Sequence, residues 1–216
     1  MKQNKSLLLF PYLLVFALLG AVALSFPQKD LHLCLNAYHS LLLDKLMVVF
    51  SSIAAYGIYA ALLFLLLWRW KIALALLIAH LSSTAVTQII KHIAKAPRPA
   101  VVFDLTNNPD ALPIVENVRM HLNNSFPSGH TTTASTLCVF LTLLVFTLMF
   151  QHSDGRSKGN KHLIFVLIYL LFFIVCLACA YSRIYLSQHF LLDVAVGGII
   201  GTLTSAFVWH LSYLRW

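Results

Sequence analysis

The chain has 216 residues, of which 60% are hydrophobic and only 10% are charged. Soluble globular domains are about 45–50% apolar and about 25% charged, so this composition argues against a soluble domain and indicates a protein that lies in a membrane. The formal net charge of +8 is divided among short basic clusters between apolar stretches, which argues against nucleic acid as a partner.

Charge-poor apolar stretches long enough to cross a bilayer recur along the chain. A transmembrane helix needs about 20 mainly apolar residues. Six stretches meet this requirement, at about 6–26, 46–68, 72–95, 128–150, 162–182 and 190–212. We therefore predict an all-α, polytopic membrane protein with six transmembrane helices, forming one domain over 1–216 with an outer loop over 96–127.

The first stretch follows Lys2 and Lys5, a pattern that also fits a signal peptide. Its apolar part is longer than a typical signal core, so a retained helix is expected. The next segment, 30–45, is too short and too polar to span. Its apolar residues recur at helical spacing and predict an interfacial amphipathic helix, with an ordinary linking helix packed on the bundle as the alternative: Leu31, Leu35, Tyr38 and Leu42.

The orientation is predicted from the charges in the connections. With the N-terminus inside, the inner side collects short, dense basic clusters: Lys2, Lys5, Arg69, Lys71, Arg156, Lys158, Lys161 and Arg215. Six of the seven acidic residues fall on the outer side. We therefore expect both termini in the cytoplasm and the outer loop at the exterior face of the membrane.

Several apolar features are assigned to packing. The cysteines of the apolar stretches, including the pair Cys176 and Cys179, are read as small buried hydrophobes. The glycines of "GGIIG" are expected to permit close helix packing: Gly197, Gly198 and Gly201. Tyr185 and Trp209 are expected to anchor the chain at the membrane interface.

The stretch "KHIAKAPRP" (91–99) places two cations at the outer end of the third span. Pro97 and Pro99 disfavour the α conformation at the residue before each of them, so the helix ends near Lys95. Lys91 then lies in the last helical turn and Arg98 on an extended exit segment. Both could reach one anion, although a cluster that anchors a helix end to headgroups is an alternative.

The stretch "FPSGHTTTA" (126–134) opens the fourth span with the usual composition of a helix start. A helix N-terminus presents free N–H groups and a partial positive charge, which favour an anion. Ser128 and Gly129 could contact that anion, and His130 could donate a proton beside it. A capped helix start with an incidental histidine is the alternative.

The stretch "SRIYLSQHFLLD" (182–193) joins the fifth and sixth spans. If the sixth helix begins here, His189 and Asp193 are neighbours at i and i+4, and the carboxylate can fix the imidazole tautomer. Arg183 supplies a planar group suited to phosphate oxygens. Because all three stretches fall on the same membrane face, together they predict a phosphate site rather than three incidental features.

In order and spacing, these motifs resemble those of the type 2 phosphatidic acid phosphatase family. Lys91 with Arg98-Pro99 fits K-x6-R-P, residues 127–130 fit P-S-G-H, and 182–193 fit S-R-x5-H-x3-D. The resemblance covers roughly residues 5–214. It implies an integral-membrane lipid phosphatase, and the family's bacterial members include lipid A phosphatases and undecaprenyl pyrophosphate phosphatases.

The resemblance also implies a role for each matching residue. His189 would be the nucleophile that forms a phosphohistidine, Asp193 its orienting partner and His130 the general acid. The phosphate cradle would comprise Lys91, Arg98, Ser128, Gly129 and Arg183. No cofactor and no metal site are expected, because Asp193 is the only carboxylate in the constellation and an ordinary two-metal site needs more.

We therefore expect hydrolysis of a phospholipid or glycolipid phosphate, either monoester or pyrophosphate, at the outer face of the membrane. No protein partner is predicted. A phosphotransferase that passes phosphate to an acceptor other than water stays an alternative, because the motifs do not specify the acceptor. A non-catalytic lipid-phosphate binding or transport protein is a further alternative, but it would not need His189 or His130.

Overall fold

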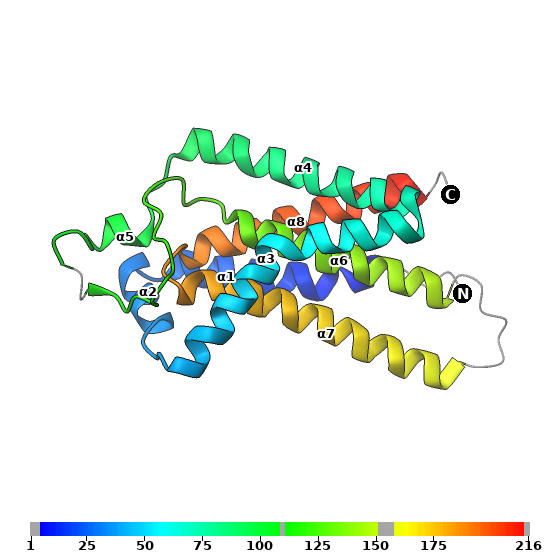
Figure 1. Cartoon of the computed structure of the whole chain (residues 1–216), viewed down its shortest axis with the longest axis horizontal. Coiled ribbons are helices and arrows are strands. Elements are labelled where there is room, and N and C mark those ends of the chain that lie inside the picture. The colour runs from blue at the N-terminus through cyan, green and yellow to red at the C-terminus, as the bar shows by residue number, and fades with distance from the viewer. Residues whose placement is uncertain (1–4, 109–110, 151–157, 214–216) are drawn as a thin grey trace.

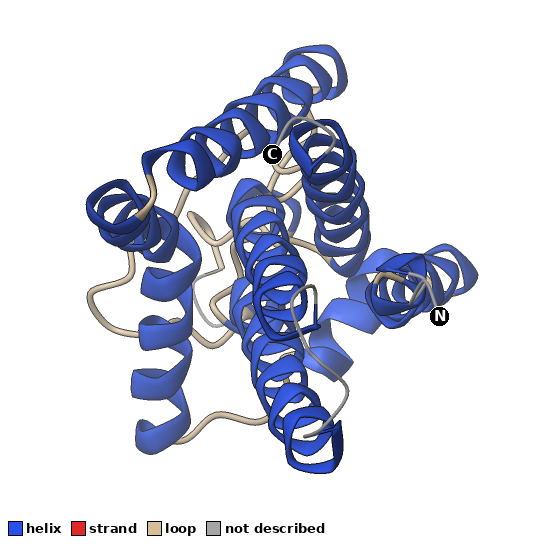
Figure 2. Cartoon of the chain, turned by 90° about the vertical axis from the view of Figure 1, so that its right-hand side faces the viewer, coloured by secondary structure: helices blue, strands red, loops and turns tan. Residues whose placement is uncertain are grey.

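The computed structural model describes residues 5–108, 111–150 and 158–213. Three basic residues used to predict the orientation, Lys2, Arg156 and Arg215, lie outside them. The described elements are η1 (Lys5–Leu8), α1 (Phe10–Ser25), α2 (Gln28–Leu35), α3 (Leu41–Trp68), α4 (Trp70–Ala94), α5 (Pro99–Val102), α6 (Gly129–Phe150), α7 (Lys158–Tyr185) and α8 (Leu191–Tyr213). These described residues form helices and connections without any strand, which confirms the all-α prediction (Figure 2).

Within the described residues, five helices are long and apolar enough to cross a membrane, namely α3, α4, α6, α7 and α8. The apolar helix α1 has 16 residues, fewer than the stretch predicted over 6–26, because the chain preceding it forms the separate 3-10 turn η1. Helix length therefore supports five spans, and α1 is a shorter candidate for the sixth.

The long helices run back and forth along one direction (Figure 1). The end of α4, the start of α6 and the junction of α7 and α8 lie at the same end of the molecule, beside α2 and α5. The three charged stretches identified in the sequence are therefore gathered at one end of the bundle. The turn between α3 and α4 lies at the opposite end.

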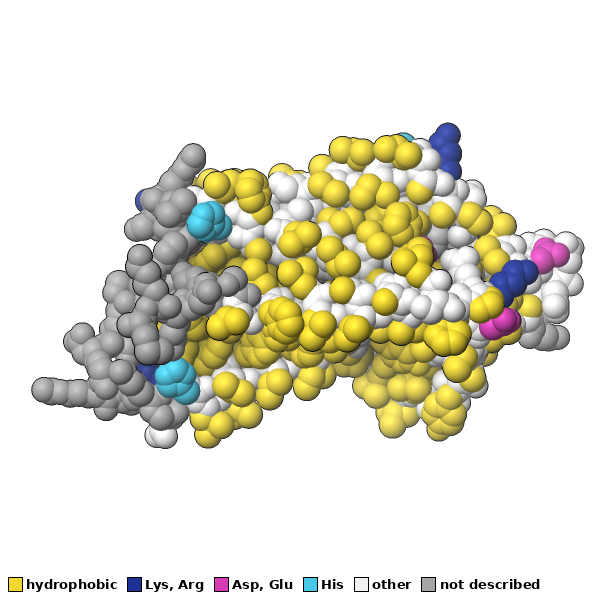
Figure 3. Space-filling view, turned by 180° about the vertical axis from the view of Figure 1, so that it is seen from behind, with side chains coloured by type: hydrophobic (Ala, Val, Ile, Leu, Met, Phe, Trp, Pro, Cys, Tyr) yellow, Lys and Arg dark blue, Asp and Glu magenta, His cyan; other side chains and the backbone are white. Residues whose placement is uncertain are grey.

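The surface of the bundle is apolar along its middle. Figure 3 shows hydrophobic side chains over the central part of one face, with Lys, Arg, Asp and Glu side chains at the end that carries the charged stretches. Large apolar side chains of the outer helices are exposed, for example Leu67 at 82% and Ile174 at 61%. In water such a surface would be unfavourable, so these faces are suited to contact with lipid.

Helices α6 and α8 pack against each other, and α8 also packs against α1 and α4. The glycines of α8 permit this approach: a Cβ atom added to Gly201 would lie 2.4 Å from the Thr132 carbonyl oxygen on α6. A Cβ on Gly198 would lie 2.4 Å from the ring of Phe16 on α1. The prediction that these glycines serve close helix packing is confirmed.

The prediction of one amphipathic helix over 30–45 is wrong. Helix α2 ends at Leu35, and α3 begins at Leu41, where the Ser40 side chain accepts a hydrogen bond from the Leu43 N–H as an N-cap. The alternative, a linking helix packed on the bundle, is confirmed for α2, because Leu31 and Leu35 pack against the hydrophobic core and His32 is buried. The polar side chains of His32 and Asn36 also face inward, because both contact the Ser187 hydroxyl.

The assignment of Tyr185 and Trp209 to the membrane interface is also wrong, since both side chains are buried. Tyr185 stacks on His39 and donates a hydrogen bond to Asp44. Trp209 packs edge-on against Phe140. By contrast, the three cysteines of the apolar stretches are buried as predicted: Cys138, Cys176 and Cys179.

Candidate active site

The loop between α7 and α8 is tied to the last turn of α7. The Arg183 carbonyl accepts hydrogen bonds from the N–H groups of both Gln188 and His189, each at 3.0 Å. Ser187, just before them, has a positive φ of 50°. This tight turn brings His189 back over the end of α7, immediately before α8 begins.

His189 and Asp193 contact each other as their spacing predicts. His189 Nδ1 lies 3.4 Å from Asp193 Oδ2, and both side chains are buried. The same carboxylate oxygen accepts hydrogen bonds from Ser125 Oγ at 2.5 Å and from the Phe190 N–H at 2.9 Å. A carboxylate beside Nδ1 favours the tautomer that carries its proton there, so the lone pair of Nε2 is left free.

Arg98 lies beside that free nitrogen. Its backbone is extended (φ −88°, ψ 166°), as predicted for a residue that precedes a proline. One guanidinium nitrogen, Nη1, lies 3.3 Å from His189 Nε2 and 3.0 Å from the Gln188 carbonyl oxygen. Arg98 Nε donates to the Asn123 carbonyl at 2.9 Å. These hydrogen bonds hold the Arg98 guanidinium beside His189 Nε2, where its positive charge can offset the negative charge of an anion at that nitrogen.

Lys91 reaches the same region from the last turn of α4, which ends before a left-handed Lys95. Its side chain is 8% exposed. Its ammonium donates to the carbonyl oxygen of Asn124 at 2.5 Å and lies 3.5 Å from that of Ser125. These carbonyls belong to the segment that also carries the Ser125 hydroxyl, so Lys91 helps to hold that segment against α8.

The start of α6 is joined directly to Asp193. The Ser128 N–H donates to the Asp193 carbonyl oxygen at 2.9 Å, and Ser128 Oγ accepts from the Thr131 N–H at 3.4 Å. Apart from the adjoining residues and the backbone of its own helix, no atom lies within 4 Å of the position that a Cβ on Gly129 would take, so the backbone is open to a ligand there. His130 is half-buried and within electrostatic range of Arg183, His189 and Arg98.

Arg183 is buried at the end of α7 and donates a hydrogen bond from Nη1 to Ser51 Oγ on α3. Its Nε has no hydrogen-bond partner among the described residues. A buried guanidinium N–H without a partner is costly unless it serves a further acceptor, which is consistent with a position at the edge of an anion site.

The electrostatic environment of His189 favours its neutral form. Burial and the positive charges of Arg98, Arg183 and Lys91 hold the pKa of the His189 imidazole well below its usual value. His189 is therefore unprotonated at neutral pH, and its Nε2 can act as a nucleophile.

All eight residues predicted for the site lie at the same end of the bundle, on α4, the segment between α4 and α6, the start of α6, the end of α7, the loop after it and the start of α8. No group of three or more His, Cys, Asp or Glu side chains that could hold a metal ion occurs within the described part of the chain.

Sequence reasoning missed three residues of this region. Ser125 donates to Asp193, the Gln188 carbonyl accepts from Arg98, and Ser51 accepts from Arg183. Ser125 lies two residues before the P-S-G-H motif, and Gln188 occupies an unspecified position inside S-R-x5-H-x3-D, so the only signal was their place in the sequence. Ser51 lies in an apolar stretch far from the motifs, and only the packing of α3 against α7 brings it close.

Comparison with known proteins places this geometry in context. A family model described as "PAP2 superfamily" matches residues 72–216, more than half of the chain. The crystal structure of Aquifex aeolicus LpxE matches with a TM-score of 0.64 and 25% identity, over 86% of this chain and 96% of that one. None of the curated proteins matches.

A second solved structure shares the fold. It is described as the first transmembrane PAP2 type phosphatidylglycerolphosphate phosphatase from Bacillus subtilis. It matches with a TM-score of 0.66 and 18% identity, over 94% of each chain.

Proposed function

This chain belongs to the PAP2 superfamily, and from that membership we propose that it is a lipid phosphatase acting through a phosphohistidine on His189. The observation that carries the proposal is the pairing of His189 Nδ1 with Asp193 while Nε2 lies beside Arg98. An imidazole in this setting is neutral, oriented and next to a cation that can hold the phosphate it attacks.

In the proposed reaction, His189 Nε2 attacks phosphorus, and the bond to the lipid oxygen breaks. His130 protonates that oxygen as it leaves. Lys91, Arg98 and Arg183, with the helix start at Ser128 and Gly129, stabilise the charge on the equatorial oxygens. Water then attacks the phosphohistidine while His130 takes up the proton that this water loses, which releases phosphate and regenerates both histidines.

We propose that this reaction needs no metal ion. Phosphoryl transfer depends mainly on positioning and on neutralising charge on the transferred group. Three cations and the start of α6 can supply both. Asp193, the carboxylate of the site, is engaged by Ser125, His189 and the Phe190 N–H, so its role is to orient the nucleophile.

The proposed setting is a bacterial inner membrane, with six spans that include α1, both termini in the cytoplasm and the site at the outer face. A site at the end of an apolar bundle lies at the depth of a lipid headgroup, so the acyl or prenyl chains can stay in the bilayer. Candidate substrates are lipid A, undecaprenyl pyrophosphate, phosphatidylglycerol phosphate and phosphatidic acid.

The proposal is tested by phosphate release from these four lipids in detergent micelles, with and without a chelator. His189→Ala and His130→Ala should each lower the rate by at least about a hundredfold. His92→Ala is the matched control, because His92 is exposed and its ring contacts the Gln88 carbonyl of its own helix. Brief incubation with ³²P-labelled lipid should label the protein with a base-stable, acid-labile phosphate.

Full activity of His189→Ala would remove the proposed nucleophile. Loss of activity with chelator, restored by a divalent ion, would remove the metal-independent reaction. Transfer of the label to an added alcohol in preference to water would identify a phosphotransferase instead.

A further inference from the structure

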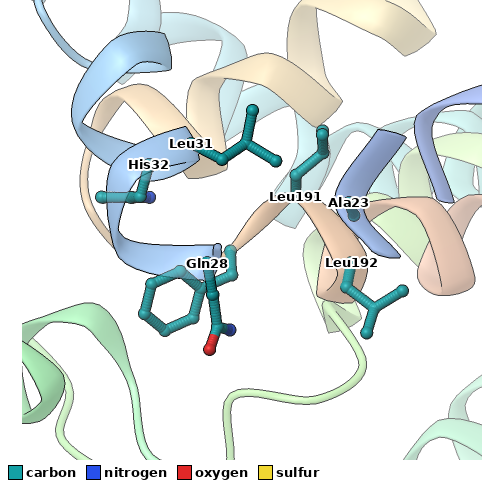
Figure 4. A pocket seen from close by; sticks show the side chains of 7 residues that line it. Ala23, Gln28, Leu31, His32, Leu191 and Leu192 are labelled. Atoms are coloured by element: carbon teal, nitrogen blue, oxygen red, sulfur yellow. The ribbon is translucent and has the colours of Figure 1, made fainter. Parts of the chain in front are cut away.

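Helix α2 and the connection that follows it pack behind the loop that carries His189. Figure 4 shows a small cavity between α2, which contributes Leu31 and His32, and the start of α8, which contributes Leu191. Beside it, the His32 ring packs edge-on against that of Phe190, with the ring centroids 5.1 Å apart. The α2 segment is thus in direct contact with the junction of α7 and α8.

The side chain of Asn36, at the C-terminal end of α2, bonds to this loop. Its amide donates a hydrogen bond to the Ser187 hydroxyl at 2.7 Å, and both residues are 1% exposed. The amide oxygen, Oδ1, lies 2.9 Å from His39 Nε2, so both ends of the amide group are engaged. Because water cannot reach this hydrogen bond, its loss would leave buried polar groups unpaired.

Asn36 is itself held in place by the chain that follows it. The His39 ring stacks on that of Tyr185, with the ring centroids 4.1 Å apart, and its Nδ1 lies 3.1 Å from Asp44 Oδ1. The Tyr185 hydroxyl donates to the same carboxylate oxygen. These contacts join the connection between α2 and α3 to the end of α7, so the amide of Asn36 approaches the loop from a fixed position.

Ser187 is the residue at which the loop reverses its direction. Its φ of 50° lies in the left-handed region, which is unfavourable for a residue with a side chain. Two residues further on, the His189 N–H bonds back to the Arg183 carbonyl. A strained conformation persists where its surroundings hold it. The described residues supply two contacts to the Ser187 hydroxyl, the Asn36 bond at 2.7 Å and His32 Nε2 at 3.4 Å.

We propose that Asn36 is a positioning residue for the nucleophile, because its bond to Ser187 keeps the loop in the turn that places His189 beside Asp193. This inference rests on the proposed function. Asn36 is buried, so it acts through the loop and not on the lipid. A shift of about 1 Å in a reacting group can cost about a hundredfold in rate, so a hydrogen bond two residues from the nucleophile can affect the chemical step.

The test compares Asn36→Ala with the parent enzyme on the most reactive of the four lipids. In single turnovers with enzyme in excess, the maximal rate at which the lipid loses its phosphate should fall at least about threefold. The enzyme concentration that gives half of this rate should change by less than about twofold, because the phosphate-binding groups keep their places.

Ser187→Ala removes the same hydrogen bond from its other side and should lower the maximal rate to a similar degree. It also carries the test alone if Asn36→Ala does not fold. The double variant should be no more than about twofold slower than either single variant, because both changes remove one interaction.

Thr142→Val is the matched control. It removes a buried contact between the hydroxyls of Thr142 and Tyr12, on a part of α6 remote from the site. Thr142→Val and Asn36→Ala should both lower the melting temperature in detergent, but Thr142→Val should keep the parent rate. An equal loss of rate in Thr142→Val would overturn the positioning role, because any lost buried contact would then slow the enzyme.

The parent rate in Ser187→Ala would overturn the proposal. Losses that multiply in the double variant would do the same, since Asn36 and Ser187 would then act separately. A raised half-maximal concentration with an unchanged maximal rate would assign Asn36 to substrate binding instead. In these three cases an inactive His189→Ala would leave the phosphatase proposal standing, whereas full activity of His189→Ala would overturn both proposals.

Discussion

At the scale of single residues, Ser125 has the clearest consequence for the proposed chemistry. Its hydroxyl donates to Asp193 and lies 3.4 Å from His189 Nδ1, so it fixes the carboxylate that orients the imidazole. It makes no contact with the free Nε2. We therefore regard Ser125 as a positioning residue.

Ser125→Ala is expected to lower kcat by at least about tenfold and to change KM by less than about twofold. The reason is the loss of a hydrogen bond to a charged group, worth about 1.5–3 kcal/mol. Steady-state kinetics on the preferred lipid measure both constants. Ser52→Ala is the control, since Ser52 bonds only to the Val48 carbonyl of its own helix. A raised KM with unchanged kcat would show that Ser125 binds substrate instead.

His32 also has a consequence for stability. Its pKa is about 4 in the folded protein and about 6.5 in the unfolded chain. Below about pH 6.5 the unfolded chain binds a proton at His32 that the folded protein does not bind. The buried neutral imidazole therefore leaves the free energy of unfolding unchanged above pH 6.5 and lowers it as the pH falls towards 4. The free energy of unfolding falls by at most about 3 kcal/mol over this range.

The melting temperature in detergent should therefore fall between pH 6.5 and pH 4. The melting temperature of His32→Gln should fall less steeply over this range than that of the parent protein. His210→Gln should follow the parent curve, because His210 is exposed. Parallel curves for the parent and His32→Gln would mean that His32 does not stay neutral in the folded state.

At the scale of elements, the α6–α8 contact holds the proposed acid and nucleophile at a fixed separation. α6 begins with Gly129 and His130, and α8 carries Asp193. Because a Cβ on Gly201 would meet the α6 backbone at 2.4 Å, even a methyl group must push the two helices apart.

Gly201→Ala should lower the free energy of unfolding by about 1–3 kcal/mol, as overpacking does. It should also lower kcat, because α6 carries His130. Gly20→Ala is the matched control, since its Cβ would meet only the Ala195 side chain at an ordinary 3.7 Å. Detergent-based thermal unfolding and kcat measure the two effects. A Gly201→Ala protein as stable as Gly20→Ala would show that the helices have room to relax.

The sequence predicts elements well where one physical rule dominates. Hydropathy predicts the five long helices, and Pro97 and Pro99 predict the end of α4. Prediction from hydropathy and spacing fails over 30–45. There the side chains of Asn36 and His32 contact the Ser187 hydroxyl, which is distant in the sequence, so no local pattern reveals these contacts. Charged site residues stand out because charge at membrane depth is costly, whereas Ser125 and Ser51 are ordinary serines until the helices assemble.

At the scale of the whole molecule, the native cysteines can test the proposed orientation. Cys34 on α2 is exposed at the end that carries the site, and the other three cysteines are buried. A membrane-impermeant maleimide should therefore label Cys34 in intact bacterial cells. Lys71→Cys in a Cys34→Ser background lies at the opposite end and should be labelled only after permeabilisation. The reverse pattern would place the site in the cytoplasm.

Asp193 contacts two separate stretches of the chain, the loop that carries His189 and the start of α6. Its carboxylate contacts His189, and its main-chain carbonyl accepts the N–H of Ser128. Asp193 therefore fixes the position of His189 relative to the start of α6, which carries His130. The P-S-G-H and S-R-x5-H-x3-D motifs must consequently come from the same enzyme. Chimaeras between related enzymes should retain activity when the crossover falls in the connection between α4 and α6 before residue 120. They should lose it when the crossover separates α6 from α8.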